Sequence, residues 1–235
     1  PTTATINRIV APTEQIPDGQ AWITMKPVEA MLADIRHSLT RLGVPAAEIA
    51  QAGESHEQLL AIAQRMKAED VHPRGKPHLA FLRAAAAGWA TFGPQLGTSF
   101  VADGDMYRRY AADERASCFV SQIDLAVDSP LTRSGAVLVD TPGADSINAR
   151  HTGVAFEYIK NADAVLFVTY YNHAFTEADR MFLNQLGSVK DVFELDKMFF
   201  LINAADLAAN DQERKAVMDH VAAQLLKHGI RNPRL

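Results

Sequence analysis

Gly135-Ala136-Val137-Leu138-Val139-Asp140-Thr141-Pro142-Gly143 is a short apolar run that ends in an acid, a hydroxyl, a proline and a glycine. Residues 136–139 do not alternate between apolar and polar, so they predict a central parallel strand that is buried on both faces. The ligands of an open α/β sheet collect at the carboxyl ends of such strands. The run therefore places Asp140 and the three residues after it at a candidate binding edge.

Asp140 suits a magnesium ion, held directly or through water, as the second acidic element of P-loop nucleotide hydrolases does. Gly143 has no side chain and lets a phosphate approach its backbone amide. The same four residues are also compatible with an ordinary type I or II turn with proline at its second position. Both interpretations stay open on this tetrapeptide alone.

A second apolar run, residues 198–202, ends in Asn203-Ala204-Ala205-Asp206. Guanine presents an N1 hydrogen and a 2-amino group side by side, so one carboxylate can accept both hydrogen bonds. Asp206 is placed for that role. A third buried strand is predicted at 164–171, and the helical patterns between these runs predict crossovers and a parallel sheet.

The chain has 235 residues, 48% of them hydrophobic, which allows one large domain with a sizeable core. Its net charge of −5 does not indicate a nucleic-acid partner. The single cysteine, Cys118, excludes an internal disulfide, suits a reducing cytosol and predicts a buried small hydrophobe. No apolar stretch reaches the roughly 18 residues of a membrane span, and residues 1–5 are unlike a signal peptide.

Residues 3–10 and 21–25 predict strands, and 118–127 predict a strand that pairs with 136–139. Residues 27–97 have a helical texture and predict a helical insertion, in which the histidines show no metal-ligand spacing. Two adjacent arginines, Arg108 and Arg109, lie on a short predicted helix. They predict a solvated helix face in preference to a contact with a phosphate or a partner subunit.

The loops at 140–143 and 203–206 resemble the third and fourth signatures of GTP-binding proteins, Asp-x-x-Gly and [Asn/Thr]-Lys-x-Asp. With residues 145–153 and 168–175, they make the chain similar to the GTPase domain of bacterial dynamin-like proteins. The resemblance implies an α/β fold of the P-loop GTPase type. It would have three layers, a mostly parallel sheet and a helical insertion. Residues 1–235 would form a partial dynamin-type GTPase domain that contains the insertion at 27–97.

The resemblance assigns Pro1-Thr2-Thr3-Ala4 to the second signature, in switch I, with Thr3 preferred over Thr2 as the magnesium ligand that positions the attacking water. It implies that Thr3 and Asp140 hold Mg2+, and that Thr3 and the γ-phosphate sensor Gly143 are catalytic. The implied nucleotide-binding residues are Asp140, Thr141, Pro142, Gly143, Asn203, Ala204 and Asp206. Without the resemblance, the preferred interpretation of residues 1–4 is a frayed terminus with no role.

Two features depart from the family pattern. The sequence contains no Gly-x-x-x-x-Gly-Lys-[Ser/Thr] loop, so we expect an internal, apparently incomplete piece whose phosphate loop precedes Pro1. A sheet without one of its central strands exposes apolar surface, which another chain or the rest of the polypeptide would cover. Ala204 replaces the signature lysine, which should weaken stacking on the base.

The resemblance implies a parent protein that binds and hydrolyses GTP with Mg2+ and couples dimerisation of its GTPase heads to membrane remodelling by fusion, fission or tethering. Its partners would be GTP and GDP, a second head, and membrane lipids through regions outside this chain. Its location would be cytoplasmic, on the inner face of the bacterial cell membrane. The segment alone should be nearly inactive. Two rivals stay open: a non-catalytic assembly module built on a degenerate GTPase half, and a P-loop hydrolase specific for adenine.

Overall fold

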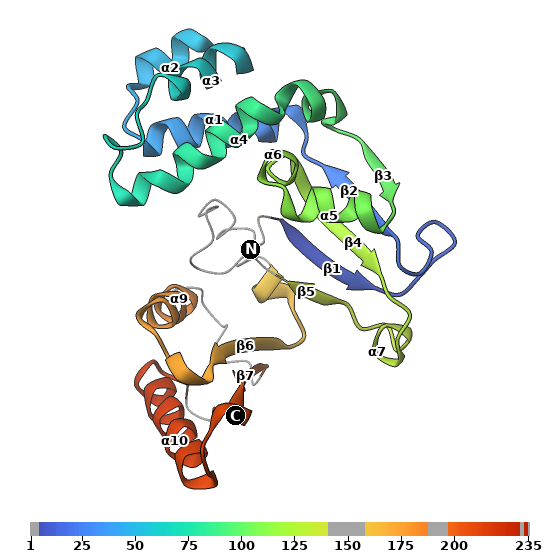
Figure 1. Cartoon of the computed structure of the whole chain (residues 1–235), viewed down its shortest axis with the longest axis vertical. Coiled ribbons are helices and arrows are strands. Elements are labelled where there is room, and N and C mark those ends of the chain that lie inside the picture. The colour runs from blue at the N-terminus through green and yellow to red at the C-terminus, as the bar shows by residue number, and fades with distance from the viewer. Residues whose placement is uncertain (1–4, 141–157, 188–196, 231–232, 235) are drawn as a thin grey trace. The chain divides into compact units, whose positions relative to one another are not determined.

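The computed structural model describes residues 5–140, 158–187, 197–230 and 233–234 of the chain. It forms two compact units, Pro1–Arg150 and His151–Leu235. Each unit combines strands with helices, which confirms the α/β class predicted from the sequence (Figure 1). Among the described residues, every helix is too short or too polar to span a lipid bilayer.

The first unit is built on a five-stranded sheet with the strand order β3-β2-β4-β1-β5. Its strands are β1 (Ile6–Val10), β2 (Ala21–Met25), β3 (Ser99–Ala102), β4 (Val120–Ala126) and β5 (Leu138–Asp140). β1 runs parallel to β4, whereas β1–β5, β2–β3 and β2–β4 are antiparallel pairs. The strand predicted at 21–25 is confirmed with the same bounds, the strand predicted at 3–10 is confirmed over residues 6–10, and both of them pair with β4.

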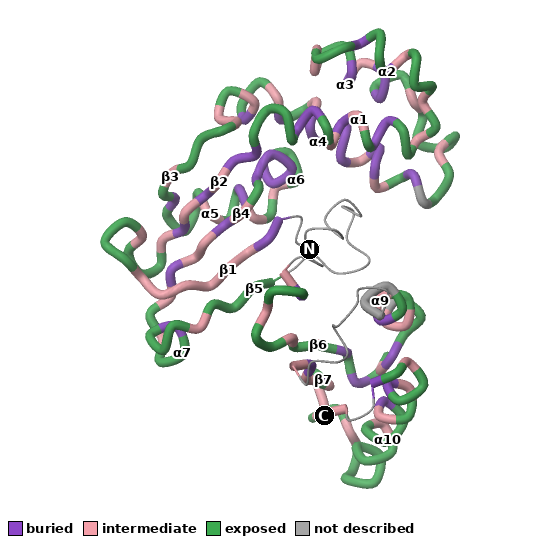
Figure 2. The backbone as a smooth tube through the Cα atoms, turned by 180° about the vertical axis from the view of Figure 1, so that it is seen from behind, coloured by how far each residue is buried: buried purple, intermediate pink, exposed green. Residues whose placement is uncertain are grey.

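Two expectations about this sheet are wrong. Residues 136–139 do not form a buried central parallel strand, because β5 is antiparallel to β1 and Val137, Leu138 and Val139 are 46%, 40% and 37% exposed. The strand predicted at 118–127 pairs with β1 and β2 and not with β5. Within the described residues β5 has one neighbouring strand. Its apolar residues, which would suit burial on both faces, therefore stay exposed (Figure 2).

Residues 27–97 are helical, as the sequence predicts. The helices are α1 (Val28–Arg41), α2 (Ala46–Ala52), α3 (His56–Gln64) and α4 (Lys76–Phe92), with the short turn η1 (Pro73–Gly75) just before α4 and η2 (Gly93–Gln95) just after it. The Ser55 side chain accepts a hydrogen bond from the Gln58 amide at 3.3 Å and caps α3. Leu32, Ile35 and Leu39 are buried against the neighbouring helices, which stabilises the bundle by removing apolar surface from water.

Lys26 ties this helical bundle to the sheet. It follows β2 directly and is only 6% exposed. Its ammonium group donates to the Asp34 carboxylate on α1 and to the Cys118 carbonyl just before β4, each at 2.8 Å. Its backbone N–H donates to the Phe119 carbonyl, and its carbonyl accepts from the Gly97 amide. One buried lysine therefore joins the start of the bundle, the sheet and the segment that returns to β3.

Three shorter helices complete the first unit: α5 (Gly104–Ala112), which packs on β2 and β3, α6 (Glu114–Ser117), which packs on α4, and α7 (Pro130–Arg133), which lies between β4 and β5 in the chain. Gly88 on α4 is where the bundle meets α6, because a Cβ there would lie 2.1 Å from the Arg115 carbonyl oxygen. Cys118 is buried, as expected. Arg108 pairs with exposed Asp105 at 3.4 Å, in agreement with a solvated helix face.

The second unit contains the parallel pair β6 (Val165–Tyr170) and β7 (Met198–Asn203). Its helices are α9 (Glu177–Gly187) and α10 (Asp211–Lys227), with the turns η4 (Tyr171–His173) and η5 (Ala205–Leu207). Phe167, Phe200 and Leu225 belong to the core on one face of this pair. Leu166, Val168 and Leu201 on the other face are 57%, 55% and 47% exposed, so the expectation of strands buried on both faces is wrong here too.

Gly88→Ala should lower the free energy of unfolding of the first unit by about 1–3 kcal/mol, because the added methyl group collides with backbone that cannot move alone. Gly104→Ala is the matched control, since a Cβ there meets nothing within 4 Å. Urea unfolding measured for both variants checks this. Equal stability of the two variants would show that α4 does not pack on α6 as described.

Lys26→Met should destabilise the first unit by roughly 2 kcal/mol, because it leaves the half-buried Asp34 carboxylate and the Cys118 carbonyl without their cationic donor. Lys76→Met, at the exposed start of α4, serves as the control and should change stability little. The readout is the urea midpoint at constant slope. A Lys26→Met midpoint equal to that of the control would contradict the role of Lys26.

Candidate functional site

Asp140 lies at the end of β5, directly opposite Asn7 on β1. Since the pair is antiparallel, the start of β1 lies at the same end of the sheet as Asp140. Thr5, the first described residue, is buried there, and its hydroxyl donates to the Ser117 carbonyl at 3.2 Å. The predicted site residues Thr3, Thr141, Pro142 and Gly143 lie outside the described residues, so their roles stay predictions.

The pairing registers place Asp140 and Asn7 on the core side of the first sheet. Asn7 also pairs with Ile123 on β4, and Ile123 pairs with Ile23 on β2. Directly paired residues share a face, and both isoleucines are fully buried. The row of side chains thus runs from apolar core to an amide and then to the exposed Asp140 carboxylate at the rim.

Asn7 is a residue that the sequence reasoning missed. Its side-chain nitrogen donates to the Thr5 carbonyl at 3.3 Å, while its amide oxygen is buried without a hydrogen-bond partner. Such an unpaired acceptor costs about 1–3 kcal/mol unless a donor reaches it. A polar residue at the fifth position of the predicted β-branched strand 3–10 was the available signal. Only the register shows that it faces the side of Asp140.

The second predicted loop follows β7. Asn203 ends the strand, and its side-chain oxygen accepts a hydrogen bond from the Ala204 amide at 2.9 Å. Ala204 has a positive φ of 59°, a left-handed conformation that is uncommon for a residue with a Cβ. Asp206 follows in η5 and is exposed. The loop therefore turns sharply after Asn203 and presents the Asp206 carboxylate to solvent.

Tyr171 lies next to this loop, because η4 packs on η5. Its ring is buried and its hydroxyl has no hydrogen-bond partner. Burial raises the pKa of the Tyr171 phenol, the Glu213 carboxylate raises it further, and Arg214 opposes this. The phenol therefore stays protonated at neutral pH. It is a second buried polar atom beside a predicted signature loop that still lacks a partner.

Chemically, the two loops offer different ligands. Within the described residues, no cluster of three or more His, Cys, Asp or Glu side chains could hold a metal ion alone. Mg2+ needs no such cluster, because it is typically held by one or two carboxylates together with waters and substrate phosphates. An exposed Asp140 beside the unpartnered oxygen of Asn7 fits a hydrated Mg2+. Asp140 and Asp206 belong to different units, so their predicted common rim remains a prediction.

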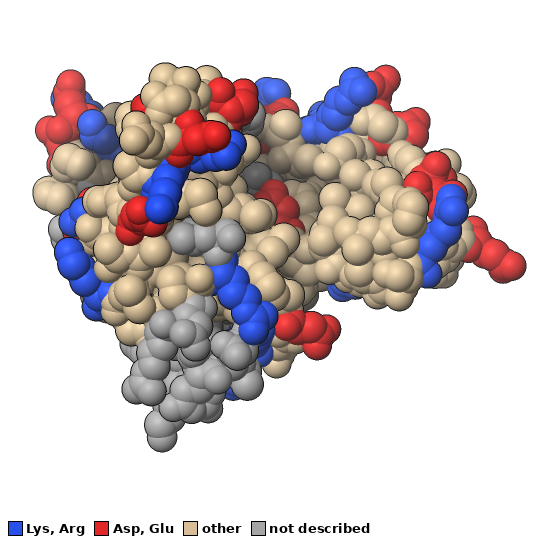
Figure 3. Space-filling model, turned by 90° about the horizontal axis from the view of Figure 1, so that it is seen from below, with Lys and Arg blue, Asp and Glu red and all other residues tan. Residues whose placement is uncertain are grey.

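The described charges on one face of the molecule do not gather into a patch of a single sign (Figure 3). On the face shown in Figure 3, Lys and Arg are interspersed with Asp and Glu, with uncharged surface between them. Large single-sign fields are what steer nucleic acids to proteins. The visible face carries no such field among its described residues.

Comparison with known proteins identifies bacterial relatives of this chain by sequence. Over its whole length the chain is 36% identical to Dynamin-like protein A of Bacillus subtilis, of which it covers 19%. It is 33% identical over 70 residues to Isoniazid-induced protein IniA of Mycobacterium tuberculosis, covering 30% of this chain and 11% of that protein. The chain thus spans about a fifth or less of the length of these two relatives.

A solved bacterial dynamin, described as an oligomerised pair with a mechanism for long-range sensing and tethering of membranes, has a similar fold. The TM-score is 0.62 at 14% identity, and the match covers 97% of this chain and 31% of that one. The model of the dynamin family matches residues 50–205, which contain β5 and β7 and end one residue before Asp206. This chain therefore belongs to the dynamin family.

Proposed function

We propose that the parent protein binds and hydrolyses GTP, and that this chain supplies its magnesium-binding and guanine-binding loops. The observation that carries the proposal is the antiparallel β1–β5 register, which brings the start of β1 and Asp140 to one end of a sheet. Asp206 at the end of β7 adds a second, independent loop of the matching residue type. Family membership supports the same activity.

In this proposal Thr3 and Asp140 hold the metal, and Asn7 accepts a hydrogen bond from a water of its hydration shell. Bound Mg2+ would neutralise charge on the β- and γ-phosphates and so lower the barrier to hydrolysis. Asp140 and Asn7 are both acceptors, so a water with two donating hydrogens can bridge them. Thr3 would position the attacking water, and the Gly143 amide would contact the γ-phosphate.

Guanine would be read by Asp206, which accepts hydrogen bonds from N1–H and the 2-amino group. Asn203 would stabilise the turn into this loop, because its side-chain oxygen accepts a hydrogen bond from the Ala204 amide. Ala204 lacks the aliphatic stem that would cover the base, so the base contact rests on Asp206. We expect a weaker affinity than a lysine-containing loop would provide.

We further propose that GTP-dependent dimerisation of the heads drives membrane remodelling from the cytoplasmic side, with lipid contacts outside this chain. Switch loops that order around the γ-phosphate and relax after hydrolysis provide the coupling. A second candidate is a non-catalytic assembly module. The Ala204 substitution favours it, as do the exposed Leu166, Val168 and Leu201 on one face of β6 and β7.

Asp206→Asn in the intact parent should weaken GTP binding about 100-fold, because it removes a charged acceptor of two hydrogen bonds, and should shift preference toward xanthosine triphosphate. Asp219→Asn, on the exposed side of α10, is the control and should leave affinity unchanged. Isothermal titration with GTP, ATP, GDP and xanthosine triphosphate gives the comparison. If the wild-type parent binds none of them, the assembly module is correct instead.

Asp140→Asn should remove most of the magnesium dependence of nucleotide affinity, since a neutral amide holds the hydrated ion poorly. In the wild-type parent, GTP should bind more tightly with Mg2+ than with a chelator, and the variant should narrow that difference about tenfold or more. Asp105→Asn on α5 is the matched control, because its carboxylate is exposed. An undiminished magnesium effect in Asp140→Asn would exclude Asp140 as the metal residue.

A further inference from the structure

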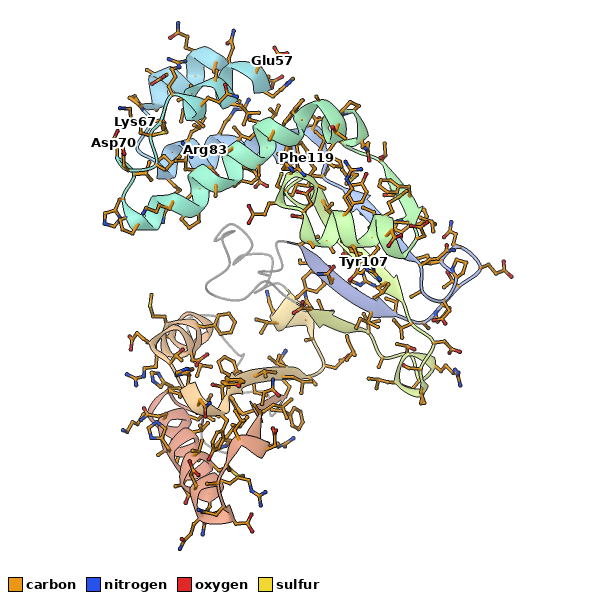
Figure 4. All side chains as sticks on the ribbon, in the orientation of Figure 1. Glu57, Lys67, Asp70, Arg83, Tyr107 and Phe119 are labelled. Carbon is orange, nitrogen blue, oxygen red and sulfur yellow. The ribbon has the colours of Figure 1, made fainter. Side chains whose placement is uncertain are left out.

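The helical bundle of the first unit contains a cavity that the proposed GTPase chemistry does not use. It has a volume of about 800 Å³, within the range of pockets for small molecules. It lies where α1 and α3 end and α4 begins. The cavity is lined by Thr40, Arg41, Leu42, Arg65, Met66, Lys67, Asp70, Val71, His72 and Gly75. Lys67 and Asp70 lie together where the chain turns from α3 toward α4 (Figure 4).

The charged side chains of the lining are mostly cationic. They are Arg41, Arg65 and Lys67, with Asp70 as the single carboxylate among the lining residues. None of the three cations forms an ion pair with a described carboxylate, although ion pairs occur at many other places on the surface. Three cations that surround one hollow repel one another, so an anion in the hollow would be stabilised by all of them.

The ordinary explanation for cations at this place is that they cap the ends of α1 and α3, where backbone carbonyls carry partial negative charge. The hydrogen bonds contradict this explanation for Arg41 and Lys67, because other groups donate to the carbonyls at these helix ends. The Thr40 carbonyl accepts from the Gly43 amide, and the Lys67 carbonyl accepts from the Asp70 amide. The Met66 carbonyl accepts from Arg83 of α4 at 2.9 Å.

Arg65 alone caps its own helix, through one N–H that donates to the Ala61 carbonyl at 3.3 Å. The other N–H groups of its guanidinium donate to no acceptor within the described residues and remain available at the cavity. Arg41 and Lys67 make no hydrogen bond or ion pair through their side chains within the described residues. Their charges are therefore not consumed by the bundle itself.

The start of α4 adds a further positive contribution. This helix has 17 residues, and its N-cap, Gly75, lies in the cavity wall. No side chain caps it, so its first amides are not satisfied by a capping group. The positive end of the helix dipole thus faces the same hollow as the three cations.

We propose that this cavity binds a soluble anion with two or more phosphate groups, held by Arg41, Arg65 and Lys67 at the start of α4. Guanidinium groups match phosphate oxygens in pairs, and the ammonium group adds a mobile third donor. A ligand with several phosphate groups can pair with all three separated cations, whereas a ligand with a single carboxylate cannot. The concave shape and the volume favour a small molecule over a flat surface such as a bilayer.

The test uses the 235-residue chain and inorganic tripolyphosphate, titrated by calorimetry at low and at physiological salt. We expect saturable binding that weakens with salt, because the contacts are mainly electrostatic. Arg41→Ala combined with Lys67→Ala should weaken binding about tenfold or more, and Lys67→Ala alone should weaken it several-fold. Asp70→Asn should tighten it several-fold. Arg108→Ala, which removes an exposed arginine far along the same unit, is the charge-matched control for a single loss.

Opposite effects of the Lys67 and Asp70 substitutions, with no effect of Arg108→Ala, would place the anion in this cavity. Vesicles of phosphatidylglycerol and of phosphatidylcholine distinguish the source of the phosphate. Flotation with the anionic vesicles that depends on Arg41 and Lys67, without tripolyphosphate binding, would overturn the soluble ligand in favour of a lipid headgroup. Equal losses for Arg108→Ala and the double variant, or no saturable binding by either assay, would overturn the site itself.

Discussion

The antiparallel pairing of β1 with β5 is the constraint on which the candidate site depends. β1 is held in register on its other side by β4, and β4 by β2, so the position of β5 follows from the packing of the whole first sheet. Because side chains alternate along a strand, a slip of one residue would turn Asp140 to the opposite face. Ile23 and Ile123 fix the register of β4 on β2, since a slip between those two strands would expose them to water.

The attachment of the helical bundle to the sheet is a second constraint, and it keeps the proposed anion site apart from the proposed metal loop. Lys26 holds the base of the helical bundle to the sheet, and Gly88 lets α4 approach α6 closely. The bundle then closes its own apolar core around Leu39, Leu59 and Leu82. Its far end, where α1 and α3 stop, is free to carry charged side chains that make no contribution to that core. A phosphate site there would be positioned by helix ends, and the metal loop by strand register.

Much of the element order could be read from residue patterns. The helical spacing of Leu32, Ile35 and Leu39 and the cap at Ser55 are local signals, and the structure contains the corresponding helices. The patterns failed where burial was inferred. Val137 and Leu138 are exposed because an apolar run records what a strand can bury, whereas its actual neighbours decide what it does bury. β3 carried no clear signal, since a four-residue edge strand has too few residues to show a period.

The chemical types at the two loops are visible in the residue order alone: a carboxylate, a hydroxyl, a proline and a glycine after one strand, and Asn203 with Asp206 after another. Those are properties of short segments, and local spacing is enough to reveal them. The folded chain was needed to show that Asn7 shares a face with Asp140 and that Arg41, Arg65 and Lys67 line one cavity. Both are contacts between distant segments, set by strand register and helix packing, which no local pattern encodes.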